Sequence, residues 1–404
     1  MHGLIVALLL LTPPAGAAPP PDKAAVSFDL LAQRARDAQQ QNRSGEALDL
    51  FRQAVALRPA WDEGWWSIGM ITYDRDNFTD CTSAFRRLRS LKPDLAPGWI
   101  MSGLCEYGLR QYDAAYRSLL QAELLGFEGS AELARVGRLH LILLLTKNSN
   151  FEHALMLCGL LFRSNTAPPE TVAAAGLAGL FRPLLPIEVP PEDRPLVQTV
   201  GEAFAAAYAK PVPEAIAKFE AALQSYPNVP AIHYRFGAYL LKNDPARGLA
   251  EIRRALEIDP AYVPSLLALS VESLDSGDYE SAQRYAAKAA QAAPANYAPH
   301  LMLGRAFLLE SKSLDLKATA GNATPAPKTA PAGKSVPAKS PSKPSPLKQA
   351  LRELELAVKL EPDSQDAHFS LIAAYTMAGR ATDAARERTQ YERLRKLATA
   401  RTGL

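Results

Sequence analysis

The chain has 404 residues, of which 48% are hydrophobic and 22% charged, and its formal net charge is +3. This is ordinary globular composition, long enough for several compact domains or one elongated array of repeats. Six lysines and one acid lie in 311–346, so the rest of the chain is close to neutral. The folded part therefore lacks the basic face that nucleic acid requires, and no nucleic-acid partner is expected.

The N-terminus has the pattern of an export signal. Leu4 to Leu11 is an unbroken apolar run, and prolines and the small residues Ala15-Gly16-Ala17 follow it. This pattern predicts a signal peptide over 1–17, cut after Ala17 or Ala18, then a linker over 18–27. The apolar run is shorter than the roughly 20 residues that span a bilayer. We therefore expect an exported protein, periplasmic or secreted, with no transmembrane segment in the mature chain.

A repeating pattern, with a period of about 34 residues, dominates the sequence from Ser44 onward. Within each period, small residues, a large apolar residue and a closing proline such as Pro59 or Pro93 return in the same order. The small residues are Ala47, Cys81 and Ala115, and the large ones are Phe51, Phe85 and Leu119. In the other half of the period, Trp65-x-x-x-Gly69 returns as Trp99-x-x-x-Gly103. Further copies follow after Pro195 and run to the C-terminal region.

This periodic pattern resembles the tetratricopeptide repeat family, here of an exported bacterial type. The resemblance implies an all-α solenoid of helix–turn–helix units, about eight to nine of them, in a right-handed superhelix interrupted once. Within each unit, small residues let the two helices approach closely, and the proline stops the second helix.

The repeats predict an array over 28–164 and a second array over 196–397. Between them, 165–195 holds one helix, Glu170 to Phe181, and then "RPLLPIEVPPEDRP", whose prolines exclude a continuous helix. We expect an irregular connector at this point. The alternative is a degenerate repeat in which a loop replaces the second helix.

The Pro-, Ala- and Lys-rich stretch 311–346 lies between two complete helices of one repeat. A normal turn needs about five residues here, so roughly 34 are extra. The stretch is therefore predicted to be an insertion in one hairpin, without regular structure. A spacer is the favoured interpretation, and a basic arm that weakly contacts an anionic envelope polymer is the alternative.

The sequence contains no motif for catalysis, cofactor binding or metal binding, so we expect no enzyme activity, no cofactor and no metal. His233, His300 and His368 recur where the early repeats carry Trp65 and Trp99, which predicts a packing role. Cys81 and Cys105 lie in neighbouring helices. They either form a disulfide or pack as two small hydrophobic side chains, and packing is the favoured alternative. Cys158 is left unpaired in both cases.

First helices line the concave face of such an array, and 3.6-residue periodicity selects the side chains that point away from the partner helix. These side chains are largely apolar or aromatic, as a peptide-binding groove requires. The predicted groove consists of Trp66, Met70, Tyr73, Ile100, Leu104, Tyr107, Tyr234, Leu241, Arg305 and Phe369. We expect a non-enzymatic scaffold that binds a partner protein or peptide there. The alternative function is a cell-envelope assembly or cell-wall factor.

Overall fold

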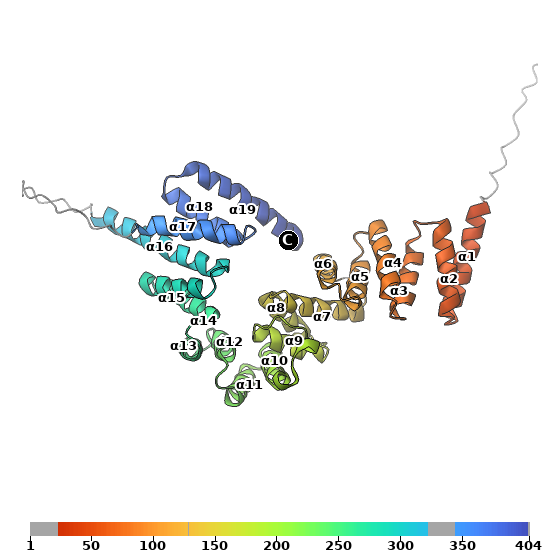
Figure 1. The fold of residues 1–404 in the computed structure, drawn as a ribbon, viewed down its shortest axis with the longest axis horizontal. Helices are drawn as coiled ribbons and strands as arrows, with labels where there is room; N and C mark the ends of the chain where they lie inside the picture. Colours follow the sequence, from red (N-terminus) through yellow and green to blue (C-terminus); the bar gives the residue numbers. More distant parts are fainter. Residues whose placement is uncertain (1–22, 128, 322–343, 403–404) are drawn as a thin grey trace, which may run out of the picture. The chain divides into compact units, whose positions relative to one another are not determined.

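A computed structural model describes residues 23–127, 129–321 and 344–402. These residues form nineteen α-helices and two short 3-10 turns, and they contain no strand (Figure 1). The predicted all-α solenoid is confirmed. The signal-peptide prediction lies outside the described residues. The first helix begins at Lys23, inside the range 18–27 that was expected to be a linker.

The chain divides into two compact units, and the first ends at Gly137. Its helices pack in antiparallel pairs, α1 with α2, α3 with α4 and α5 with α6, and each pair packs on the next. These helices are α1 (Lys23–Gln40), α2 (Ser44–Leu57), α3 (Asp62–Tyr73), α4 (Phe78–Leu91), α5 (Ala96–Gly108) and α6 (Tyr112–Leu124). Helix α7 (Ala131–Lys147) contains the point of division.

The second unit begins at Arg138 and repeats the same construction. Helices α12 and α13, α14 and α15, α16 and α17, and α18 and α19 form antiparallel pairs. The helices are α8 (Phe151–Arg163), α9 (Glu170–Gly179), α10 (Arg194–Ala209), α11 (Val212–Ser225), α12 (Pro230–Leu240), α13 (Pro245–Ile258), α14 (Val263–Asp275), α15 (Tyr279–Ala292), α16 (Tyr297–Gly321), α17 (Pro346–Leu360), α18 (Gln365–Met377) and α19 (Ala381–Thr402).

Glycine on the first helix of a pair lies directly against a large side chain on the second. A Cβ added at Gly103 would stand 2.6 Å from Cγ of Leu119, and one at Gly69 would overlap the ring of Phe85. Phe85 and Leu119 are themselves fully buried. The short distance between the helix axes therefore depends on these glycines.

The turn inside the early hairpins places one residue in the left-handed region. Asn42, Asp76 and Arg110 have φ of 56°, 55° and 58°, and they occupy the same position in three successive hairpins. The equivalent turns after α14 and α18 use Gly277 and Gly379, at φ of 78° and 70°. Glycine adopts this conformation without steric cost, whereas the three other residues carry some strain.

Helices α9 and α10 cross at two glycines. A Cβ at Gly176 would overlap the backbone carbonyl oxygen of Val197, and one at Gly201 would overlap that of Val172. The helix expected at Glu170 to Phe181 is thus present, two residues shorter, and it packs closely on α10. Only glycine at both positions allows this approach, because backbone cannot move aside as a flexible side chain does.

The proline-rich residues between α9 and α10 form two 3-10 turns, Pro186–Glu188 and Pro191–Asp193. Glu188 holds the first turn, because it accepts hydrogen bonds from the Leu185 amide at 2.7 Å and from Lys147 Nζ at 2.7 Å. These two donors lower the pKa of Glu188, and the amide contributes most. The segment 165–195 therefore holds one helix and a pinned loop, while its role as a boundary between two arrays stays a prediction.

Helix α16 continues to Gly321, so 311–321 is helical although the sequence favoured an irregular segment from Ser311. The reason is local, because Leu314, Leu316 and the lysines are good helix formers and the first proline of the segment, Pro325, comes later. Residues 322–343 of the insertion lie outside the described residues, and its last residue, Pro346, already begins α17.

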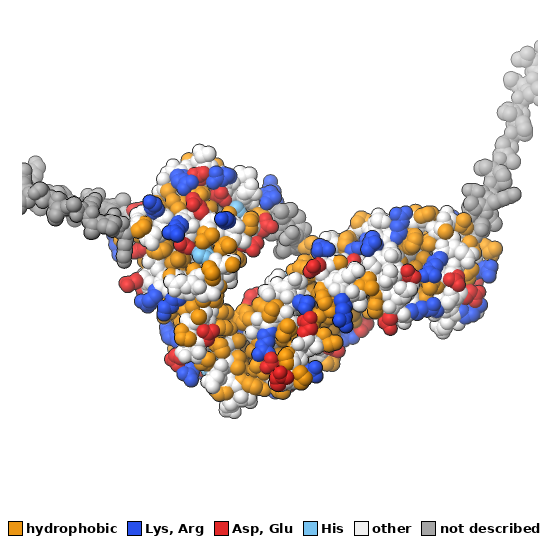
Figure 2. All heavy atoms as spheres, in the orientation of Figure 1, with side chains coloured by type: hydrophobic (Ala, Val, Ile, Leu, Met, Phe, Trp, Pro, Cys, Tyr) orange, Lys and Arg blue, Asp and Glu red, His pale blue; other side chains and the backbone are white. Residues whose placement is uncertain are grey.

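Charged side chains of both signs are interspersed over the face shown in Figure 2. Within the described ranges, no helix is long and apolar enough to cross a membrane.

Candidate functional site

The ten side chains of the predicted groove differ widely in exposure. Phe369 and Leu241 are 59% and 38% exposed, and six others are half-buried. The half-buried ones are Trp66, Met70, Tyr73, Tyr107, Tyr234 and Arg305. The binding groove of first helices stays a prediction.

Ile100 and Leu104 do not lie on the surface, so their inclusion in the groove is corrected. They are 0% and 4% exposed. Ile100 lies against Gly137 of α7, where an added Cβ would be 2.8 Å from Ile100 Cγ2. The helix that follows in the array thus covers this position, which periodicity within α5 alone could not reveal.

Aromatic groove residues of the first unit pack within their own hairpins. The ring of Trp66 meets Phe85 edge-on at 5.5 Å between centroids, and that of Tyr107 meets Tyr112 at 5.3 Å. In the second unit Arg305 Nε donates to Ser370 Oγ at 2.9 Å, and its Nη2 lies 3.2 Å from Asp366 Oδ1. Arg305 therefore joins α16 to α18 and is not a free cation.

Tyr234 belongs to a cluster that sequence reasoning did not identify. Its ring lies 5.9 Å from Phe181 and 6.0 Å from Tyr262. Arg235 lies over Phe181 at 4.1 Å, pairs with Glu152 at 2.7 Å, and is 8% exposed. Its guanidinium also donates to the carbonyls that end α9. The cluster therefore fastens the C-terminus of α9 to α12, and the cation–π position is occupied by the protein's own arginine.

The hydroxyl of Tyr262 is buried in this cluster without a hydrogen-bond partner in the structure. Burial raises the pKa of this phenol well above its ordinary value. The group is therefore a neutral phenol at physiological pH, and it does not supply a base or a nucleophile.

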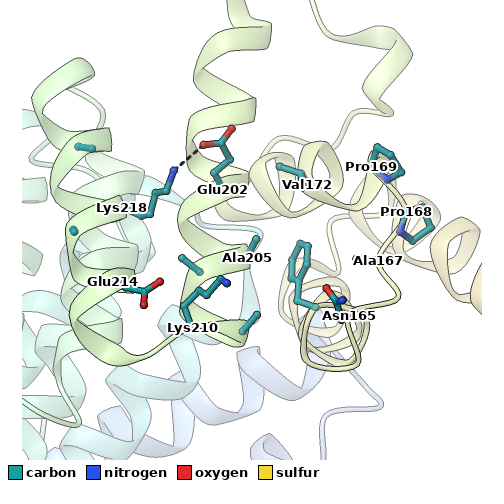
Figure 3. A pocket seen from close by; sticks show the side chains of 15 residues that line it. Asn165, Ala167, Pro168, Pro169, Val172, Glu202, Ala205, Lys210, Glu214 and Lys218 are labelled. Carbon is teal, nitrogen blue, oxygen red and sulfur yellow. Dashed lines mark hydrogen bonds and ion pairs between the residues drawn. The ribbon is translucent and has the colours of Figure 1, made fainter.

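A groove with a volume of about 820 Å³ lies between α10 and α11 on one side and α8 and the start of α9 on the other. Its lining includes Phe162, Pro168 and Val172 together with alanines of α10 and α11, of which Ala205 is labelled in Figure 3. These alanines are Ala205, Ala206, Ala209, Ala217 and Ala221. The size of this groove is typical of ligand and peptide sites.

Two acids and two lysines border this groove. Lys218 Nζ lies 3.3 Å from Glu202 Oε2, and Gln198 donates to the other oxygen of Glu202 at 3.1 Å. These two donors lower the pKa of Glu202, with Gln198 the larger cause. Lys210 and Glu214 stand at the opposite end, where α10 gives way to α11 (Figure 3). The border is electrically balanced.

The sequence could not distinguish this groove from the core. Ala203 and Ala215 are buried between helices, whereas Ala209 and Ala217, with the same side chain, line the open groove. A signal exists in "FAAAYAKPVPEAIAKFEAAL", where alanines occupy more than one face of each helix. Apolar side chains on two faces indicate a second buried or binding surface.

The three periodic histidines make the same contacts in each repeat. His233 Nδ1 lies 2.7 Å from Glu251 Oε2, and its Nε2 donates to the carbonyl of Pro227 at 3.0 Å. His300 repeats the pattern with Glu353 and Pro294, and His368 with Glu387 and Pro362. No group of metal ligands exists among the described residues.

Trp65 and Trp99 make the matching hydrogen bond in the first unit. Their Nε1 atoms donate to the carbonyls of Pro59 and Pro93 at 2.9 and 2.8 Å. In every case the acceptor lies six residues before the ring. The recurring position therefore needs a ring N–H that donates to the carbonyl of the proline directly after the C-cap of the preceding helix, and both tryptophan and histidine supply one.

Cys81 and Cys105 form a disulfide, with 5.9 Å between their Cα atoms, although the sequence favoured two free side chains. That distance lies within the range that disulfides require. The bond joins α4 to α5 and so links two successive hairpins. Cys158 is free and buried, and burial raises the pKa of its thiol to about 12.

Comparisons with known proteins agree with the repeat geometry. A family model described as "Tetratricopeptide repeat" matches residues 267–329. A search of curated proteins returns no significant match.

Three solved structures illustrate the structural similarity. "MamA RS-1 ArsTM double mutant" is 18% identical over 46% of this chain and 86% of its own, with a TM-score of 0.34. Yeast Tom70 is 13% identical over 94% and 96%, with a TM-score of 0.28. YrrB, described as a TPR protein with an unusual peptide-binding site, is 13% identical over 61% and 97%, with a TM-score of 0.28. These similarities are too distant to indicate a function. The matched range and the repeated hairpins, in which glycine on the first helix lies against a large apolar side chain on the second, together show that this chain contains tetratricopeptide repeats.

Proposed function

We propose that this protein is a non-enzymatic, exported scaffold that holds an apolar segment of a partner protein in the groove between α8, α9, α10 and α11. The repeat fold itself indicates a protein–protein interaction scaffold, and proteins of this class are generally non-catalytic. The observation that carries the finer proposal is the apolar groove of about 820 Å³ that is lined by alanines of α10 and α11.

The charges and the side-chain sizes in the groove indicate which kind of partner segment it would bind. Its border carries two lysines and two acids, so neither a strongly basic nor a strongly acidic segment gains from it. The small side chains of α10 and α11 leave room for the larger apolar side chains of a partner, which would bury the apolar lining. We therefore expect an uncharged segment with apolar side chains on one face.

Two observations support export. The apolar run Leu4 to Leu11 followed by small residues is typical of a signal peptide. The Cys81–Cys105 disulfide is of a kind that persists mainly in oxidising compartments. N-terminal sequencing of protein from the native host should give Ala18 or Pro19 as the first residue, and an uncut Met1 would contradict the signal-peptide proposal.

Site-specific photo-crosslinking tests the groove. A benzoylphenylalanine at Ala217, which is exposed in the groove, should give a discrete protein adduct in living cells of the source. The same group at Ala292, an exposed alanine of α15 outside the groove, is the matched control. Identical adducts from both positions, or none from Ala217, would contradict the proposal. Filling the groove with Ala209→Trp should abolish the adduct while helicity and melting stay unchanged.

The predicted groove of first helices is a separate candidate. The double variant Trp66→Ala, Tyr107→Ala tests it against the intact protein, since both side chains are half-buried. If the recovered partners are the same for both proteins, the first-helix groove of the first unit does not bind them.

A further inference from the structure

Two successive parts of the first unit are built alike but differ at one point. Helices α2 and α3 correspond to α4 and α5, one repeat later in the sequence. Trp65 and Trp99 are equivalent, and both donate to the proline carbonyl six residues earlier. The surroundings of these two tryptophans can therefore be compared position by position.

An arginine covers Trp99. The guanidinium carbon of Arg89 lies 4.4 Å from the ring centroid, and Nη1 donates to Ser118 Oγ at 2.8 Å. Its Nη2 lies 3.6 Å from a carboxylate oxygen of Glu106, which is only 5% exposed. Arg89 itself is 15% exposed. The side chain thus extends from α4 across the tryptophan to α5 and α6, and it fills the space between these helices.

The equivalent space at Trp65 is open. In the preceding repeat, Val55 takes the place of Arg89, Ala84 that of Ser118, and Thr72 that of Glu106. A hollow of about 440 Å³ remains there, and Val55, Trp65, Ile68 and Ala84 line its apolar part. The replacement of arginine by valine therefore leaves the space for a side chain that this chain does not supply.

Two carboxylates and one guanidinium lie at this hollow. Arg52 and Asp80 both line it and pair at 2.7 Å, while Asp49, outside the lining, lies 4.0 Å from the same guanidinium. Asp80 also accepts a hydrogen bond from Asn77 Nδ2 at 3.0 Å. Two carboxylates thus share one guanidinium at the rim, and the indole face adds its own attraction for positive charge.

We propose that the hollow beside Trp65 binds an arginine side chain of a partner protein, with the guanidinium over the indole as Arg89 lies over Trp99. Arginine fits better than lysine, because its planar group stacks on an aromatic face and is more weakly hydrated. The site lies in the first unit and is independent of the groove proposed above. It is therefore a second recognition site, and its test does not depend on the result for the groove.

The four tryptophans of the chain allow a direct test. In protein labelled with ¹⁵N at the indole, four signals are expected, and single Trp→Phe replacements at Trp61, Trp66 and Trp99 assign them. The probe is N-acetylarginine amide, and the control is N-acetylcitrulline amide, which has the same shape without the charge. The arginine derivative should shift the Trp65 signal saturably. The Trp99 signal should stay in place, because Arg89 already covers that ring.

Three variants sharpen the result. Val55→Arg should fill the hollow from within and raise the apparent Kd by at least ~10-fold, an effect of about 1.4 kcal/mol. Leu57→Arg adds the same charge to α2 at an exposed position outside the hollow and should leave binding unchanged. Asp80→Asn should weaken binding of the arginine derivative only. It remains informative if Val55→Arg does not fold, which circular dichroism reveals.

The proposal is overturned if the arginine and citrulline derivatives shift the Trp65 signal equally, or if neither shifts it. It is also overturned if folded Val55→Arg protein binds the probe as well as the Leu57→Arg control does.

Discussion

The imidazole of His300 lies 2.8 Å from the carboxylate of Glu353, although 53 residues separate the two in the chain. In two other hairpins of the second unit, the equivalent pairs His233–Glu251 and His368–Glu387 are 18 and 19 residues apart. Helices α16 and α17 are therefore the two halves of one hairpin, and roughly one repeat length of extra chain enters at its turn.

This relationship predicts that the extra chain can be removed. Replacing 310–346 by Ser-Gly-Asp, the turn that joins α14 to α15, would restore a His–Glu separation of 19 residues, as in α18 and α19. We expect the melting temperature to change by less than about 4 °C, because the pair contacts lie outside the excised part. Thermal unfolding followed by circular dichroism measures this, after allowance for the lost turns of α16. A collapse of the C-terminal hairpins would show that the segment holds them together.

The buried His–Glu pair of the last hairpin should be its strongest polar contact. His368 and Glu387 side chains are 5% and 10% exposed, and their atoms lie 2.7 Å apart. Glu387→Ala should reduce the opening free energy of α18 and α19 by about 2 kcal/mol, because the buried Nδ1 atom of His368 loses its hydrogen-bond partner. Amide hydrogen exchange measures this free energy without assuming that the whole array unfolds at once.

Glu392→Ala, at an exposed position of the same helix, is the control and should change the free energy by less than about 0.5 kcal/mol. Equal effects of the two substitutions on the opening free energy would show that the His368–Glu387 pair does not stabilise the hairpin.

The cysteines should react in a fixed order. In protein purified from an oxidising compartment, the native state should show no reactive thiol, since Cys158 is buried and burial raises its pKa to about 12. Unfolded protein should show one thiol without reductant and three with it, because Cys81 and Cys105 are joined. Mass spectrometry after alkylation counts them, and three thiols without reductant would exclude the disulfide.

Loss of this bond should also lower stability. Cys81 and Cys105 are 24 residues apart in sequence. In the chain-entropy model, a disulfide that closes a loop of this length adds about 3 kcal/mol to the free energy of unfolding. The double substitution Cys81→Ala, Cys105→Ala should therefore unfold the first unit at clearly lower denaturant concentration than Cys158→Ala unfolds it.

Gly176 and Gly201, where α9 and α10 cross, should tolerate no larger residue. Gly176→Ala would set a methyl group against the backbone oxygen of Val197, and separating the helices should cost about 3 kcal/mol. Gly45→Ala on α2 is the control, because its nearest neighbour would be an arginine side-chain atom at 3.6 Å. That control should be neutral or stabilising by up to about 1 kcal/mol, since alanine is the better helix former. Equal melting temperatures of the Gly176→Ala and Gly45→Ala variants would contradict the close packing of α9 on α10.

Periodicity predicted the hairpins because each repeat must bury the same small and large residues, as Ala47, Phe51 and their counterparts do. It also predicted that the histidines pack, since they recur in register with Trp65 and Trp99. The physical cause is a hydrogen bond from the ring N–H to the carbonyl of a proline six residues earlier, and only the three-dimensional structure shows it.

Other features depend on contacts between residues far apart in sequence. Gly176 and Gly201 look ordinary in their own helices, and only their mutual approach gives them a role. Ile100 satisfies the groove periodicity but is covered by α7. Likewise, the exchange of Arg89 for Val55 seems a neutral variation between repeats until the space over each tryptophan is compared.

The distribution of tryptophan and histidine between the two units determines what tryptophan fluorescence reports. All four tryptophans lie at or before Trp99, in the compact unit that ends at Gly137, while the histidines replace them at the equivalent positions of the second unit. Indole emission is therefore a reporter of the first unit alone, and it is blind to unfolding of the second. A melt recorded by emission and by helical ellipticity together separates the two units in one unmodified sample.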